Sequence, residues 1–76
     1  MVQAYVTIMT AAGTAKEAID GIRSIEGVDT AHIVAGEFDI VAQVTADEER
    51  DLLQLVTDEI QPIEGVGRTS TYIVLE

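Results

Sequence analysis

The chain contains no cysteine and one proline, and only four of its 76 residues are lysine or arginine. Without cysteine, neither a disulfide framework nor a thiolate metal site can stabilise the fold, and nothing points to secretion. No apolar run approaches the roughly 18 residues of a membrane span, and the first residues lack a basic region and a cleavage pattern. We therefore expect a soluble, cytoplasmic protein with no membrane partner.

Basic side chains are outnumbered by 14 aspartates and glutamates, which gives a formal net charge of -10 at pH 7. Such a surface repels phosphate backbones, and three aromatic residues are too few for a base-stacking platform, so we expect no direct binding to nucleic acid. Two explanations of the acidity stay open. One is adaptation to a cytoplasm of high salt, in which screening offsets the mutual repulsion of the carboxylates, and the other is an ordinary small acidic protein.

Alternating and helical patterns divide the chain, residues 1–76, into the elements of one domain. Alternation predicts a strand over residues 2–10, and β-branched residues indicate strands over 28–35, 38–45 and 66–75. Thr14 and Thr45 are each followed three residues later by glutamate, which predicts a capping box at the start of two helices. Apolar stripes mark these helices, with Ala18, Ile19, Ile22 and Ile25 in the first and Leu52, Leu53, Leu55, Val56 and Ile60 in the second.

A short internal repeat shows how both helices end. The pattern Ile-x-x-Ile-Glu-Gly-Val occurs at residues 22–28 and 60–66, and Pro62 stops the second helix. We expect Gly27 and Gly65 to take positive φ after the helices. The resulting order, βαββαβ, predicts an α+β, ferredoxin-like fold of the dimeric α+β barrel type, in which two helices cover one face of a four-stranded antiparallel sheet.

The sheet face without helices carries apolar groups that a solvated face would not need. The alternation places Tyr5, His32, Val34, Val41 and Tyr72 on this face, and a patch of this size predicts contact with another sheet in a dimer. A domain of 76 residues buries only about 60% of its unfolded surface, so self-association would add to a thin core.

Between the second and third strands lies the sequence Gly36-Glu37-Phe38-Asp39. It can be read as a tight hairpin turn in which Gly36 takes positive φ and Asp39 bonds to nearby backbone amides. It can also be read as a binding site.

Other chemistry is sparse. His32 is the only histidine and has no partner nearby in the sequence, which favours a packed or interface residue over a catalytic base or metal ligand. The acidic stretches 47–49 and 58–59 could bind a hard cation, but the first lies where a helix begins, where carboxylates favour the helix dipole. We therefore predict no metal, no cofactor and no catalytic residues.

Two segments carry a resemblance to a known family. The turn Val34-Ala35-Gly36-Glu37-Phe38-Asp39 and the closing pattern Gly-Val-x-x-Thr-x-Thr of residues 65–71 resemble the effector-binding (RAM) domain of the Lrp/AsnC, or feast/famine, transcription regulators. The similarity covers essentially the whole chain, with Ala35 in a position where the family usually has threonine or serine. Family members usually carry an N-terminal helix-turn-helix domain, whereas here the first strand begins at Val2, so we expect a stand-alone sensor.

The resemblance implies a homodimer formed sheet to sheet, dimers that join into rings, and an amino-acid effector held between dimers. It also implies assembly with full-length Lrp/AsnC regulators, through which the module would modulate transcription without contacting DNA. In the family, the glycine of the turn admits the effector and offers its amide to a carboxylate, while the aspartate accepts hydrogen bonds from the ammonium group. The effector-binding residues carried over in this way are Val34, Gly36, Glu37, Asp39, Glu64, Gly65, Thr69 and Thr71, and those assigned to the dimer interface are Tyr5, His32, Val41 and Tyr72.

Two other functions remain open at this point. One is a ligand-free structural module that serves only in oligomerisation. The other is a small enzyme of the dimeric α+β barrel type, in which His32 would act with Tyr5 or Tyr72.

Overall fold

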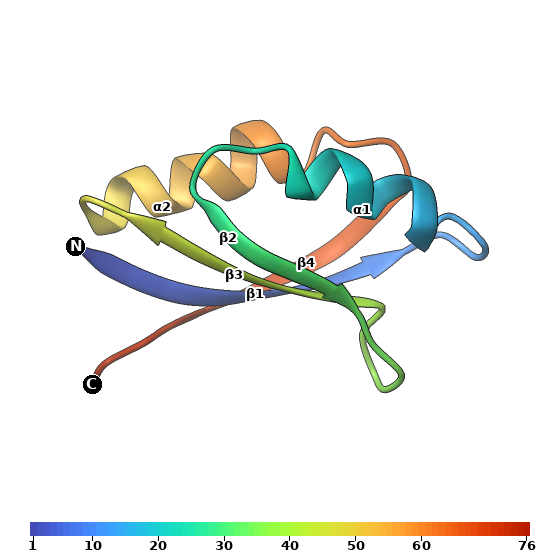
Figure 1. The fold of residues 1–76 in the computed structure, drawn as a ribbon, viewed down its shortest axis with the longest axis horizontal. Helices are drawn as coiled ribbons and strands as arrows, with labels where there is room; N and C mark the ends of the chain where they lie inside the picture. The colour runs from blue at the N-terminus through green and yellow to red at the C-terminus, as the bar shows by residue number, and fades with distance from the viewer.

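A computed structural model describes all 76 residues and places two helical segments over one face of a four-stranded sheet (Figure 1). The elements follow the order β1 (Val2–Thr10), α1 (Ala15–Arg23), β2 (Val28–Ile33), β3 (Ile40–Ala46), α2 (Glu49–Leu55), η1 (Val56–Ile60) and β4 (Val66–Ile73). The strands lie in the order β2-β3-β1-β4, and each neighbouring pair is antiparallel. The predicted ferredoxin-like fold and its order of elements are confirmed. No helix is both long and apolar enough to cross a membrane.

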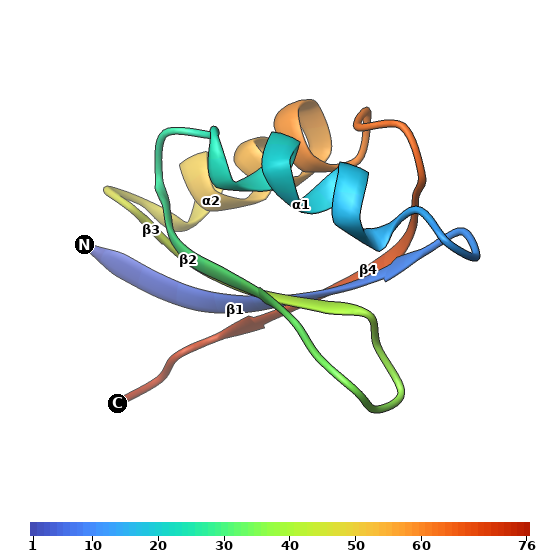
Figure 2. The same ribbon diagram turned by 45° about the vertical axis from the view of Figure 1, so that its right-hand side comes forward.

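The hydrophobic core lies between the helical layer and the sheet, and the two layers are seen edge-on in Figure 2. Directly paired residues of antiparallel strands share a face, so the pairs of Val6 with Ala42 and of Ile8 with Ile40 place four buried side chains under the helices. Ile22 and Leu52 are fully buried against them from the helices. In contrast, Leu53 is 49% exposed, so its predicted place on the buried stripe is wrong.

Neither predicted capping box forms. Thr14 does occupy the N-cap position of α1, but its hydroxyl donates to the carbonyl of Ala11 instead of accepting from the helix. Thr45 lies within β3, where its hydroxyl donates to the carboxylate of Asp29, and the N-cap of α2 is Glu48. Both threonines have the predicted spacing, but each hydroxyl donates to an acceptor outside the helix that the spacing does not indicate.

Several boundaries differ from the prediction by a few residues. Helix α1 ends at Arg23, before Ile25, and the strands β2 and β3 are shorter than predicted, which leaves residues 34–39 as a loop. The second helix continues from α2 into the π-helical turn η1, and it ends just before Pro62.

The glycines divide into those that the fold requires and one that it does not. Gly27 and Gly65 have φ of 103° and 94°, which confirms the prediction for the two repeated turns. Gly36 does not have positive φ, so this part of the hairpin-turn hypothesis is wrong. A Cβ atom added at Gly36 would meet nothing within 4 Å.

The outer edge of β2 is occupied by a side chain from α1. Arg23 donates from Nε and Nη2 to the carbonyl oxygen of Ala31, at 3.0 and 2.8 Å. The amide of Val34 donates to the carbonyl of Asp39, on the side of β3. Backbone groups of successive residues in a strand point to opposite sides, so those of Ala31, three residues earlier, point outwards. The guanidinium therefore satisfies a carbonyl that the sheet leaves free.

Candidate functional site

The loop of residues 34–39, between β2 and β3, projects away from the helical layer at one end of the sheet (Figures 1 and 2). Residues 34–37 are exposed, and Phe38 and Asp39 are half-buried. The backbone amides of residues 35–38 donate to no acceptor within the chain, whereas those of Val34 and Asp39 are bonded. The loop therefore presents four consecutive N–H groups to its surroundings.

Asp39 joins this loop to the end of β1. Its carboxylate oxygen Oδ2 accepts a hydrogen bond from the amide of Thr10 at 2.8 Å, and its own amide donates to the carbonyl of Ile8 at 3.0 Å. The Asp39 carboxylate thus bonds to a backbone amide, but that amide belongs to β1, whereas the turn hypothesis predicted an amide of the hairpin turn. Its other carboxylate oxygen, Oδ1, has no partner within the chain, and an ionised carboxylate can accept several hydrogen bonds.

The turn before β4 reaches the same end of the sheet from the other side of β1. The amide of Ala11 donates to the carbonyl of Gly65 at 2.9 Å, and the Thr14 hydroxyl donates to the carbonyl of Ala11 at 2.8 Å. A hollow of about 350 Å³ lies here, lined by Thr14, Glu17, Ile63, Glu64 and Gly65. Two of the predicted effector-binding residues, Glu64 and Gly65, therefore line a hollow next to the end of β1.

The structure does not bring Thr69 and Thr71 to the loop. These residues pair with Ile8 and Val6, whose side chains are buried under the helices, so both threonines lie on the helical side of β4. The hydroxyl of Thr69 accepts a hydrogen bond from Nε2 of Gln61 at 3.0 Å. Asp39, in contrast, precedes β3, and its carboxylate bonds to the amide of Thr10 at the end of β1.

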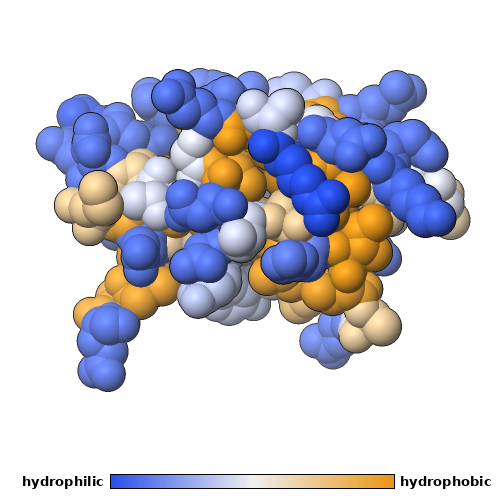
Figure 3. All heavy atoms as spheres, viewed as in Figure 1, coloured by the Kyte–Doolittle hydropathy of each residue, from blue (hydrophilic) through white to orange (hydrophobic).

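The four predicted interface residues do lie together, on the sheet face without helices. Tyr5 is paired with Tyr72, and His32 is paired with Val41. The two tyrosines are 45% and 55% exposed, and Val34 is 38% exposed. Figure 3 shows hydrophilic atoms over the helical layer and a hydrophobic area at the lower right, where β2 runs into the loop. His32 lies on this face, and no group of three or more acidic or histidine side chains that could hold a metal occurs in the structure.

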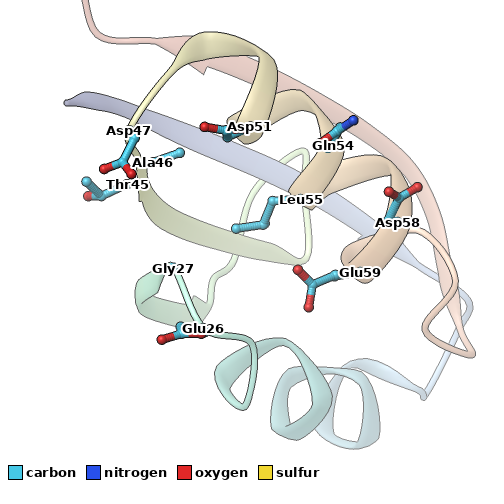
Figure 4. A pocket seen from close by; sticks show the side chains of 10 residues that line it. All are labelled: Glu26, Gly27, Thr45, Ala46, Asp47, Asp51, Gln54, Leu55, Asp58 and Glu59. Atoms are coloured by element: carbon cyan, nitrogen blue, oxygen red, sulfur yellow. The ribbon is translucent and has the colours of Figure 1, made fainter.

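The largest hollow lies elsewhere, between α2, η1 and the turn at Gly27 (Figure 4). It measures about 570 Å³ and is lined by five carboxylates, those of Glu26, Asp47, Asp51, Asp58 and Glu59. The sticks in Figure 4 show these side chains spread around the rim. The acidic stretches of the sequence thus share one wide, open hollow, and they do not form a metal cluster.

Sequence reasoning missed Thr10, Ala11 and Thr14 as parts of this end of the sheet. Thr10 and Asp39 are 29 residues apart, and no spacing rule connects them. Only the pairing of β1 with β3 brings them together.

The order of the elements and the sheet topology define a ferredoxin-like module, and comparisons with known proteins identify its family. The family model of the Lrp/AsnC ligand binding domain matches residues 3–76. The chain is 40% identical over 60 residues to an uncharacterised HTH-type transcriptional regulator from Pyrococcus furiosus. That match covers 79% of the chain and 40% of the relative, so the chain spans less than half of that relative's length.

Two solved structures extend the comparison. A hypothetical protein from Pyrococcus horikoshii superposes with a TM-score of 0.91 at 33% identity, over 100% of this chain and 92% of that one. A transcriptional regulator from Neisseria meningitidis, solved as a complex with L-Met, superposes with a TM-score of 0.87 over 99% of this chain and 51% of that one. Its 22% identity supports the fold alone.

The chain belongs to the Lrp/AsnC family, as a ligand-binding domain of that family. The P. furiosus relative is named as a transcriptional regulator, which separates the chain from the enzymes of similar fold that the sequence had left open.

Proposed function

We propose that this chain is an amino-acid-sensing and oligomerisation module that modulates transcription through Lrp/AsnC-type regulators without contacting DNA itself. Gly36 is the observation that supports this most directly. Its φ is not positive, and no neighbouring atom within 4 Å requires the absence of a side chain. The fold therefore gives no reason for glycine in an exposed loop, whereas close approach by a ligand or a second copy gives one.

The chemistry of the loop suits a zwitterion. The free amides of residues 35–38 can donate to the carboxylate of an amino acid, as backbone N–H groups do in other anion sites. The unpartnered Oδ1 of Asp39 can accept from the ammonium group in a charge-assisted hydrogen bond. The exposure of residues 34–37 fits a site that is completed by a second dimer.

The open sheet face would form the homodimer, and the loop would join dimers into rings. Tyr5 and Tyr72 are about half exposed on neighbouring strands of the face, where pairing of two sheets would bury them. The net charge of -10 supports an action on transcription that passes through other proteins. Assembly with a full-length Lrp/AsnC regulator would supply the contact with DNA.

A thermal-shift screen against the twenty amino acids, at high salt, tests the sensor function. An amino acid at about 100 times its dissociation constant adds roughly 2.7 kcal/mol of stability, and each kcal/mol raises the melting temperature of a domain this small by about 4–8 °C. We expect one amino acid or a small group of them to raise it by at least about 10 °C. If none does, the sensor function is wrong and a ligand-free structural module becomes the better explanation.

Analytical ultracentrifugation tests the oligomerisation function separately. We expect a dimer without effector and a larger assembly when the active amino acid is added. A monomer at every concentration would contradict the interface on the open face. A mixture with a full-length Lrp/AsnC regulator, run in the same way, tests whether hetero-assemblies form.

A further inference from the structure

The two turns at the end of the sheet are joined through Thr10, the last residue of β1, and the residue that follows it, Ala11. Amides of consecutive strand residues point to opposite sides. The amide of Thr10 points towards β3 and bonds to Oδ2 of Asp39, and the next amide, that of Ala11, points towards β4 and bonds to the carbonyl of Gly65. Two successive peptide groups thus hold the loop on one side and the turn on the other.

The Asp39 side chain supplies an acceptor that the backbone of β3 does not supply at this position. Strand β3 begins at Ile40, which pairs with Ile8, so the amide of Thr10 lies beyond the last backbone partner that β3 offers. The carboxylate of Asp39 supplies the acceptor. The pairing of β1 with β4 is irregular at the same place, because its register shifts between Ile8 and Thr10 before Thr10 pairs with Val66.

The connection continues into the first helix. The Thr14 hydroxyl donates to the carbonyl of Ala11, and the Oγ1 atom of Thr14 would lie 2.8 Å from a Cβ added at Gly65. Ala11 is therefore held through its amide by the turn before β4 and through its carbonyl by the start of α1.

We propose that Asp39 is a positioning residue that acts through Thr10 and Ala11, and that these contacts couple the loop of residues 34–39 to the turn at Glu64–Gly65 and to the start of α1. This inference deepens the proposed function and rests on it in one respect: the coupling would transmit the occupancy of the loop to the opposite turn. In this arrangement Oδ2 holds the end of β1, and only Oδ1 remains for an effector.

Asparagine and alanine at position 39 separate the hydrogen-bond acceptor from the charge. Asp39→Asn keeps a side-chain oxygen that can accept from Thr10, whereas Asp39→Ala removes it. By NMR without any amino acid added, we expect exchange of the Thr10 amide proton to be faster by on the order of tenfold or more in D39A, because a hydrogen bond to an ionised group is lost. We also expect the resonances of Ala11 and Gly65 to shift in D39A and to stay near their original positions in D39N.

Asp20→Ala is the matched control, because it removes an exposed carboxylate from α1 that makes no hydrogen bond in the structure. It should leave the Thr10 and Gly65 signals unchanged. The proposal is wrong if D39A changes only the signals of residues 34–39, or if D39N loses protection at Thr10 as D39A does. In the second case the charge of Asp39, and not its place as an acceptor, would be responsible.

A second pair of variants, at Thr14, tests the coupling from the start of α1, and this test can be made even if D39A fails to fold. Thr14→Ala removes the hydroxyl that holds Ala11, and Thr14→Ser retains it. We expect T14A to shift the amide resonances of Gly36 and Glu37 and T14S not to. Unchanged loop resonances in T14A would contradict the coupling. Because these measurements use no effector, they stand even if the thermal-shift screen finds no amino acid that binds.

Discussion

Alanine at Gly36 should stabilise the fold, although glycine stands there in a turn that resembles a binding motif. The φ of Gly36 is not positive and an added Cβ meets nothing within 4 Å, so alanine fits without strain. Replacing a glycine under these conditions restricts the unfolded chain and adds about 0.4–1 kcal/mol to the free energy of unfolding. We expect the melting temperature to rise by roughly 2–8 °C.

Gly27 provides the comparison that makes this test sharp. Its φ is 103°, and an added Cβ would lie 2.7 Å from Cδ1 of Leu55, a buried side chain. A side chain in the left-handed region costs roughly 1–2 kcal/mol, and overpacking of the core costs roughly 1–3 kcal/mol more. G27A should therefore destabilise the protein by about 2–5 kcal/mol, in the opposite direction to G36A.

Urea unfolding followed by circular dichroism measures both variants at equal protein concentration, since association would otherwise shift the midpoints. If G36A lowered the free energy of unfolding by more than about 1 kcal/mol, the fold itself would require this glycine. The presence of glycine at position 36 would then no longer support a ligand site. The thermal-shift screen adds a second measurement on the same variant. If Gly36 admits an effector, G36A should lose the response to amino acids while it gains stability.

Three further outcomes follow from the core, the open face and the charge. Leu52→Ala, at a fully buried position, should lower the free energy of unfolding by about 2–5 kcal/mol in urea, and a loss below 1 kcal/mol would contradict the described core. Val41→Lys should convert the proposed dimer into monomers in sedimentation, whereas Leu53→Lys, on the exposed side of α2, should not. Raising the salt concentration from about 0.01 to 0.15 M shortens the screening length from about 30 to 8 Å. The melting temperature should therefore rise for a chain with a net charge of -10, because its carboxylates repel one another less. An unchanged melting temperature would show that this repulsion does not limit the stability of the fold.

Local sequence patterns predicted the helices, strands and turns because these elements are determined by residues that are close together in the sequence. The repeated Ile-Glu-Gly-Val turns indicated positive φ at Gly27 and Gly65, and the structure has it at both. Alternation along β1 and β3 placed Tyr5 and Val41 on the face without helices, and the strand register agrees. These features depend on residues within a few positions of each other, so a single sequence is enough to find them.

The candidate site was less predictable because its contacts join distant segments. Thr14 is a local exception, because it has the spacing of a capping residue but its hydroxyl donates to the carbonyl of Ala11, three residues before it. The role of Asp39 at the end of β1 depends on where β3 begins, and the sequence placed that start two residues too early. Thr69 and Thr71 were carried over from the family pattern, and only the register of β4 shows that they face the helices.

The contact of Arg23 with Ala31 has a consequence for how copies of this chain can associate. An open-ended ribbon of sheets requires two free edges in each copy, one to receive a neighbour and one to offer to the next. The guanidinium occupies one outward carbonyl of β2, so strand pairing at this edge would have to displace Arg23, which favours pairing at the other edge, β4. Pairing through β4 alone ends with two copies. An acidic protein with a thin core is thereby directed towards closed assemblies and away from fibres.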